Sequence, residues 1–226
     1  ELNLGWLDTV VFNCSYGWHY ANIPPLGIWQ SVVLEKVPAV EIQNPFIVAR
    51  SIDGILDSSV DLVGQGGVDG VLKATISPKN FTGVPYSFAY RVSSASPKAN
   101  VRLQFRIPDP QLWWPNGLGD QNLYRLDLAF VDKNGRTLDG DSISFGIRTI
   151  EMRPAGEDGA PEKPDLYHWK FVINGEPVFI KGAGWCTIDA LMRFSRENYD
   201  KYLSLAKQQN IQMLRAWGGG MVETDE

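Results

Sequence analysis

Cysteine, positive charge and long apolar runs are all scarce in this sequence. Its 226 residues include only Cys14 and Cys186, whose separation suits neither a metal site nor a redox motif, so no disulfide framework is predicted. His19 and His168 are isolated and offer no metal set, and nothing points to a cofactor. Lys and Arg number 21 against 26 Asp and Glu, and the basic residues are scattered, so a nucleic-acid partner is not expected. No apolar run approaches the roughly 20 residues of a membrane helix, and no membrane partner is expected either.

Aromatic residues, glycine and proline are abundant instead. Aromatic residues make up 12% of the chain, which also has 22 Gly and 14 Pro, a combination that favours strands and turns. Alternating apolar residues predict a series of short strands, with residues 132–135 as a hairpin turn. These strands are expected at residues 40–49, 58–63, 68–76, 86–92, 101–107, 124–131 and 142–152. Seven strands in about 115 residues predict an immunoglobulin-like β-sandwich.

The pattern changes after a polar segment at residues 154–164, which is predicted to lie on the surface. Asn174-Gly175 predicts a hairpin whose second strand covers residues 177–181. Ser195 can cap a helix, and residues 211–217 follow as another strand. Strand, helix and strand at this spacing predict a βαβ unit with parallel strands. Because two parallel strands do not make a domain, we expect an α/β domain that begins here and is cut off. We also expect the chain to begin with the end of another domain, whose start is missing.

Several motifs in one order resemble glycoside hydrolase family 2. Residues 171–185 (FVINGEPVFIKGAGW), together with residues 210–220 and Glu223, resemble the start of that family's catalytic barrel. Residues 112–119 (LWWPNGLG), residues 123–124 and residues 145–148 (FGIR) are similar to its sandwich domain, and residues 27–32 to the last strand of its jelly-roll domain. The resemblance implies a mainly β chain in three parts. These are the end of a jelly-roll sugar-binding domain (1–37), an immunoglobulin-like β-sandwich (38–153), and a linker with the truncated start of a (β/α)8 TIM barrel (154–226).

The resemblance also implies an activity for the parent protein. Family members of this kind are retaining exo-β-glycosidases, which need two carboxyl groups about 5 Å apart. In the family these glutamates follow the fourth and seventh barrel strands, so no catalytic residue is expected in this chain and the fragment is predicted to be inactive. Residues 215–220 (RAWGGG) and the loop around Trp18 favour the β-mannosidase branch. Two departures leave β-glucosaminides and β-galactosides as alternatives: His19-Tyr20 stands where that branch has Asp-Trp, and Gly184 stands where many relatives have Asn.

The residues that follow parallel strands are the candidate site, because α/β folds bind ligands there. The tryptophans can stack on a sugar or pack within a barrel, and the three glycines at 218–220 can approach a ligand or only form a turn. The resemblance implies substrate contacts at Trp18, Trp185, Asp189, Arg215, Trp217, Gly218 and Glu223. Trp113 and Trp114 are either a sugar platform or, as strand alternation favours, one core residue and one domain-interface anchor.

Further expectations concern the substrate, the location, the alternative function and self-association. The substrate is expected to be a glycan or oligosaccharide, and a periplasmic or secreted location follows from the glycan-degrading relatives. A non-catalytic carbohydrate-binding or spacer sandwich is the alternative function. An incomplete barrel leaves apolar surface without a partner, so self-association is also expected.

Overall fold

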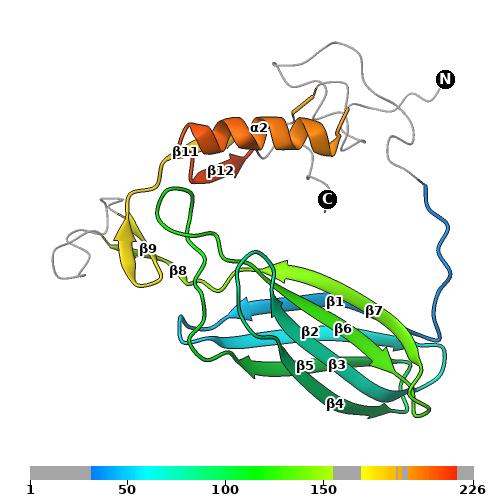
Figure 1. Ribbon diagram of the computed structural model, residues 1–226. Helices are drawn as coiled ribbons and strands as arrows, with labels where there is room; N and C mark the ends of the chain where they lie inside the picture. The colour runs from blue at the N-terminus through cyan, green and yellow to red at the C-terminus, as the bar shows by residue number, and fades with distance from the viewer. Residues whose placement is uncertain (1–31, 155–168, 187, 190–192, 218–226) are drawn as a thin grey trace, which may run out of the picture. The chain divides into compact units, whose positions relative to one another are not determined.

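The computed structural model describes residues 32–154, 169–186, 188–189 and 193–217 (Figure 1). Residues Glu35–Phe179 form one compact unit, and a second unit contains the described residues from Ile180 onward. None of the helices in the described part of the chain is long and apolar enough to cross a membrane.

The first unit contains a sandwich of two antiparallel sheets (Figure 1). One sheet has the order β1-β2-β5, with β1 at Val40–Ala49, β2 at Ile55–Gly64 and β5 at Lys98–Arg106. The other has the order β4-β3-β6-β7, with β3 at Val68–Pro78, β4 at Tyr86–Ser94, β6 at Tyr124–Val131 and β7 at Thr137–Phe145. Three strands facing four is the arrangement of an immunoglobulin-like sandwich, and the mainly β prediction is confirmed.

Alternating residues from both sheets fill the space between them. On β5, Leu103 and Phe105 are buried while Arg102, Gln104 and Arg106 are exposed, as their alternation predicts. Phe105 packs against Phe88 of the opposite sheet, with ring centroids 4.7 Å apart. Burial of each large apolar side chain contributes about 1.5–3 kcal/mol, so this alternation is the main source of the sandwich's stability.

The two sheets are joined along one side, where β1 lies next to β7. The backbone N–H of Ile42 donates to the Asp139 carboxylate over 2.7 Å. A side chain of β7 thus satisfies an unpaired donor on the edge strand β1, which both closes the sandwich and blocks edge-to-edge pairing there.

The predicted strand at 142–152 is wrong as one element. β7 ends at Phe145, Ile147 is still buried in the sandwich core, and a separate strand, β8 (Ile150–Pro154), begins three residues later. Gly146 follows the end of β7 directly, and Trp113 packs on it. The Trp113 Cβ lies 2.8 Å from where a Cβ of residue 146 would lie, so glycine is needed for this close approach. The apolar alternation changes phase between Ile147 and Ile150, and this change marks the break.

β8 belongs to a second small sheet in the same unit. It pairs antiparallel with β9 (Trp169–Ile173), which in turn pairs with β10 (Glu176–Val178) across the predicted Asn174-Gly175 turn. Since Pro154 and Trp169 are partners in this ladder, the polar segment predicted as a linker connects two strands of one hairpin. The compact unit therefore continues to Phe179, past residue 153.

The second unit contains the predicted βαβ pattern. β11 (Gly182–Trp185) and β12 (Met213–Ala216) pair in parallel, and α2 (Arg196–Gln208) lies between them in sequence. Ser195 caps α2, since its hydroxyl accepts the Asn198 backbone N–H at 3.3 Å. The first parallel strand is β11 and not the predicted 177–181, because the hairpin register pairs Pro177 and Val178 with β9.

Apolar side chains of the second unit remain accessible within the described residues. From Ile180 onward, those more than a third exposed are Tyr202, Leu203, Leu205, Met213 and Leu214. They are the physical basis for expecting self-association, which stays a prediction.

Candidate functional site

Trp185 and Trp217 meet at the carboxyl ends of the parallel strands. Trp185 is the last residue of β11, and the backbone N–H of Trp217, directly after β12, donates to its carbonyl oxygen over 2.9 Å. Trp185 pairs with Ala216 in the ladder. Since successive residues of a strand face opposite sides, the Trp217 side chain shares a face with Arg215 and not with Trp185.

The Trp185 ring packs on the helix. It stacks on Tyr199 of α2 with ring centroids 6.5 Å apart and an interplanar angle of 20°. Phe194, just before the helix, lies 6.2 Å from the same tyrosine ring. These contacts favour packing between strand and helix over sugar stacking as the role of Trp185.

Asp189 is held by an ion pair. The Arg193 guanidinium donates to one carboxylate oxygen of Asp189 from Nε (3.0 Å) and Nη2 (2.7 Å), and the Asp189 side chain is 15% exposed. The hydrogen bond and the attraction of Asp189 raise the pKa of Arg193. The Arg193 carbonyl in turn accepts the Asn198 side-chain amide at 3.0 Å. Asp189 is therefore tied to Arg193, which in turn contacts Asn198 in the first turn of α2.

Other residues of the predicted site are distributed as follows. Arg215 on β12 is exposed and opposite Gly184, where an added Cβ would meet no described atom within 4 Å. Position 184 therefore has room for a side chain. Cys186 is a free, exposed thiol immediately after Trp185. Trp18, Gly218 and Glu223 lie outside the described residues. No group of three or more His, Cys, Asp or Glu suited to a metal occurs in the described part of the chain.

The paired tryptophans of the sandwich have structural contacts. The Arg148 guanidinium lies 4.3 Å from the Trp113 ring centroid. Trp114 packs on Gly119, where a Cβ would lie 2.7 Å from the ring. Both tryptophans are half-buried, so the expectation that one lies in the core is wrong. Leu112, the preceding residue, packs against the core instead. The cation over Trp113 leaves less of that ring for a sugar.

Asn174 has a role that sequence reasoning missed. Its side-chain amide donates to the Trp113 carbonyl and its side-chain oxygen accepts the Thr149 backbone N–H, each over 3.0 Å. Its own N–H donates to the Thr149 carbonyl, also over 3.0 Å. The Asn-Gly pair predicts only the turn, yet the asparagine also fastens the hairpin to the Trp113 loop.

Comparison with known proteins points to one family. Residues 40–148 match the model described as Glycosyl hydrolases family 2. The chain is 30% identical over 215 residues to Beta-mannosidase B of Aspergillus terreus, covering 93% of this chain and 24% of that protein. It is 29% identical over 214 residues to the Mannosylglycoprotein endo-beta-mannosidase of Lilium longiflorum, covering 88% and 21%. The structure of Beta-D-Mannosidase from Dictyoglomus thermophilum matches with a TM-score of 0.70 and 30% identity, covering 83% and 22%. The chain thus spans less than a quarter of the length of each of these relatives.

Proposed function

Because residues 40–148 place this chain in glycosyl hydrolase family 2, we propose that it is part of an exo-acting, retaining β-glycosidase of the β-mannosidase type. The observation that carries the proposal is the extent of the likeness. Similarity to a protein named Beta-mannosidase B covers 93% of the chain, so it includes the sandwich and the βαβ unit together. If unrelated proteins shared only the sandwich fold, the similarity would not extend into the segment that follows the sandwich.

The chemistry of such an enzyme limits what this portion can do. Retaining hydrolysis needs a carboxylate nucleophile and a carboxylic acid about 5 Å apart, on either side of an oxocarbenium-like transition state. Asp189, the described acidic residue of the candidate site, is paired with Arg193. We assign it to holding Arg193 next to the start of α2, and we assign both catalytic carboxylates to parts of the parent protein outside these 226 residues. The chain alone is then inactive.

Activity measurements on two proteins test the proposal. The parent protein should hydrolyse p-nitrophenyl β-mannoside with a higher kcat/KM than the β-glucosaminide and the β-galactoside, while the 226-residue chain should give no turnover. A preference for the β-glucosaminide would contradict the mannosidase assignment and keep the glycosidase. Turnover by the 226-residue chain that is lost on Glu223→Gln would contradict the assignment of the carboxylates.

A spacer role for the sandwich is compatible with this function. Arg148 lies over the Trp113 ring, and the Trp113 carbonyl accepts a hydrogen bond from Asn174. These contacts use the conspicuous aromatic motif to hold the sandwich to the hairpin. In the proposed enzyme, the sandwich therefore contributes support rather than substrate contacts at this motif.

A further inference from the structure

A β-bulge interrupts the edge strand β1. Gln43 pairs with Asp61 of β2, and Phe46 pairs with Ser59, so the two residues Asn44-Pro45 oppose a single residue. Asn44 adopts a left-handed backbone conformation, with φ of 51°. Bulges of this kind bend a strand and re-aim the side chains that follow.

The bulge places an aromatic ring on the outside of the sheet. Val40 and Ile42 face the core, and unbroken alternation would put Phe46 there as well. Instead Ile47 is buried and the Phe46 side chain is 56% exposed. The buried Ser58 hydroxyl donates to the Phe46 carbonyl over 2.7 Å and holds the bulge. An exposed phenylalanine forgoes about 1.5–3 kcal/mol of burial, and here the bulge fixes which side of the sheet the ring occupies.

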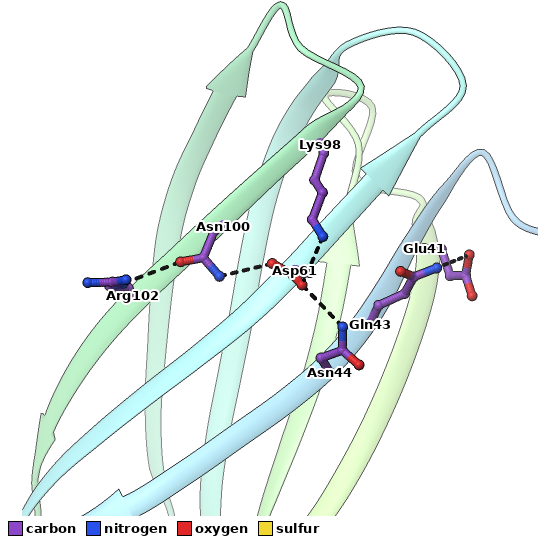
Figure 2. A network of polar contacts seen from close by, with 7 residues as sticks. All are labelled: Glu41, Gln43, Asn44, Asp61, Lys98, Asn100 and Arg102. Atoms are coloured by element: carbon purple, nitrogen blue, oxygen red, sulfur yellow. Dashed lines mark hydrogen bonds and ion pairs between the residues drawn. The ribbon is translucent and has the colours of Figure 1, made fainter.

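Polar side chains on the same face of the sheet hold one another in place (Figure 2). The Asp61 carboxylate accepts hydrogen bonds from the amides of Asn44 (3.1 Å) and Asn100 (2.9 Å), and the Lys98 ammonium lies 3.3 Å away. The side-chain oxygen of Asn100 accepts a hydrogen bond from Nε of Arg102 at 3.4 Å. The groups are therefore oriented before any ligand arrives.

The row that contains the ring keeps unused hydrogen-bonding groups. By register, Phe46 is opposite Ser59 and Ser59 is opposite Arg102. In the next row, the Gln104 amide donates to Asp57 over 3.1 Å. The Ser59 hydroxyl, the two Nη atoms of Arg102 and the Gln104 side-chain oxygen make no hydrogen bond to any described residue. An exposed ring is thus flanked by both donors and acceptors.

These features restrict the ligand. A protein interface needs about 800 Å² on each side with an apolar centre, whereas the exposed apolar side chains of this face are Phe46 and Val48. Acidic and basic residues are interspersed here, so the face suits no polyanion. A sugar ring presents an apolar C–H face to an aromatic ring and hydroxyls to amide, hydroxyl and guanidinium groups.

We propose that this face binds a neutral β-linked oligosaccharide at a site separate from the ends of β11 and β12. We call it the Phe46 surface, and its residues are Asn44, Phe46, Asp57, Ser59, Arg102 and Gln104. The site is inferred from the bulge and the polar rows. The choice of a mannose oligosaccharide as the probe rests on the proposed function.

Titration of the 226-residue chain with β-1,4-mannohexaose, followed by ¹H–¹⁵N NMR, tests the proposal. Backbone shifts should cluster on the Phe46 surface. Phe46→Ala should weaken binding about tenfold or more, because a central aromatic contact is lost. Phe179→Ala is the matched control, since that side chain is 84% exposed and lies elsewhere in the unit, and it should leave binding unchanged. Both substituted side chains are exposed, so an unaltered thermal midpoint checks that the variants remain folded.

Three results would overturn the proposal: no clustered shifts at millimolar mannohexaose, equal binding by Phe46→Ala and the unmodified chain, or equal weakening by the two phenylalanine variants. Equal binding of cellohexaose would support the surface and assign it to β-glycans in general. The titration needs no turnover, so an inactive parent protein with a positive titration rejects the proposed function alone. An active parent with a negative titration rejects the Phe46 surface alone.

Discussion

Replacing Asn174 should loosen the attachment of the β9–β10 hairpin to the Trp113 loop. The side chain is 6% exposed and makes two hydrogen bonds of 3.0 Å, to the Trp113 carbonyl and the Thr149 N–H. Asn174 also has φ of 51°, a left-handed conformation that asparagine and glycine tolerate better than other residues. Two separable effects therefore depend on this one residue.

The two effects can be measured apart with two variants. Each side-chain hydrogen bond contributes about 0.5–1.5 kcal/mol net, so Asn174→Gly, which keeps the backbone conformation accessible, should lose about 1–3 kcal/mol. Asn174→Ala loses the same hydrogen bonds and adds roughly 1–2 kcal/mol for a Cβ in the left-handed region. Alanine should therefore destabilise this unit more than glycine does.

Hydrogen exchange at single amides measures the change where it occurs, which matters because the chain contains two compact units and a global unfolding curve can mix them. In both variants the Thr149 amide should exchange at least about fivefold faster, which corresponds to about 1 kcal/mol. The Leu72 amide on the central strand β3 should keep its rate and is the internal control. Unchanged Thr149 exchange, or equal loss of stability in the glycine and alanine variants, would refute the reasoning.

Three further substitutions test other parts of the first unit by urea unfolding. Gly70→Ala should destabilise the sandwich by about 1–3 kcal/mol, because the new Cβ would lie 2.4 Å from a backbone carbonyl of β6. Gly66→Ala is the control in the same unit and should be neutral, because a Cβ there would meet no described atom within 4 Å. Tyr124→Phe should cost about 1–2 kcal/mol, since the buried hydroxyl accepts a backbone N–H over 2.8 Å, and an unchanged midpoint would contradict this. The hydrogen bond from Asn100 is the main cause that lowers the pKa of Asp61 below its usual value of 3.8. As the pH falls, the Asp61 carboxylate is therefore protonated at a higher pH in the unfolded chain than in the folded chain. The folding stability that the ionised carboxylate contributes at neutral pH is lost as the pH falls through its folded pKa. Asp61→Asn should lose less stability between pH 7 and pH 3 than the unmodified chain, and an equal loss would count against the pairing.

Local patterns in the sequence were sufficient for most of the sandwich. The strand at Val40–Ala49 has its predicted bounds, and the hairpin turn at Asn174-Gly175 has the left-handed backbone its residues favour. Alternation could not supply the phase of β1 after the bulge, which decides that Phe46 is outside and Ile47 inside. A signal was present, because proline within a strand is confined to edges and bulges and Pro45 sits in the middle of this one.

The candidate site depended on register more than on motif. A strand at 177–181 leaves Trp185 in a loop, free to face a ligand beside Trp217. With the strand at Gly182–Trp185, the ladder itself assigns faces, and a shift of one residue would exchange them. Trp185 then faces Tyr199 of α2, while Arg215 and Trp217 share the opposite face. The substrate contacts predicted for Trp185, Arg215 and Trp217 therefore divide between the two faces of this strand pair, and they stay predictions.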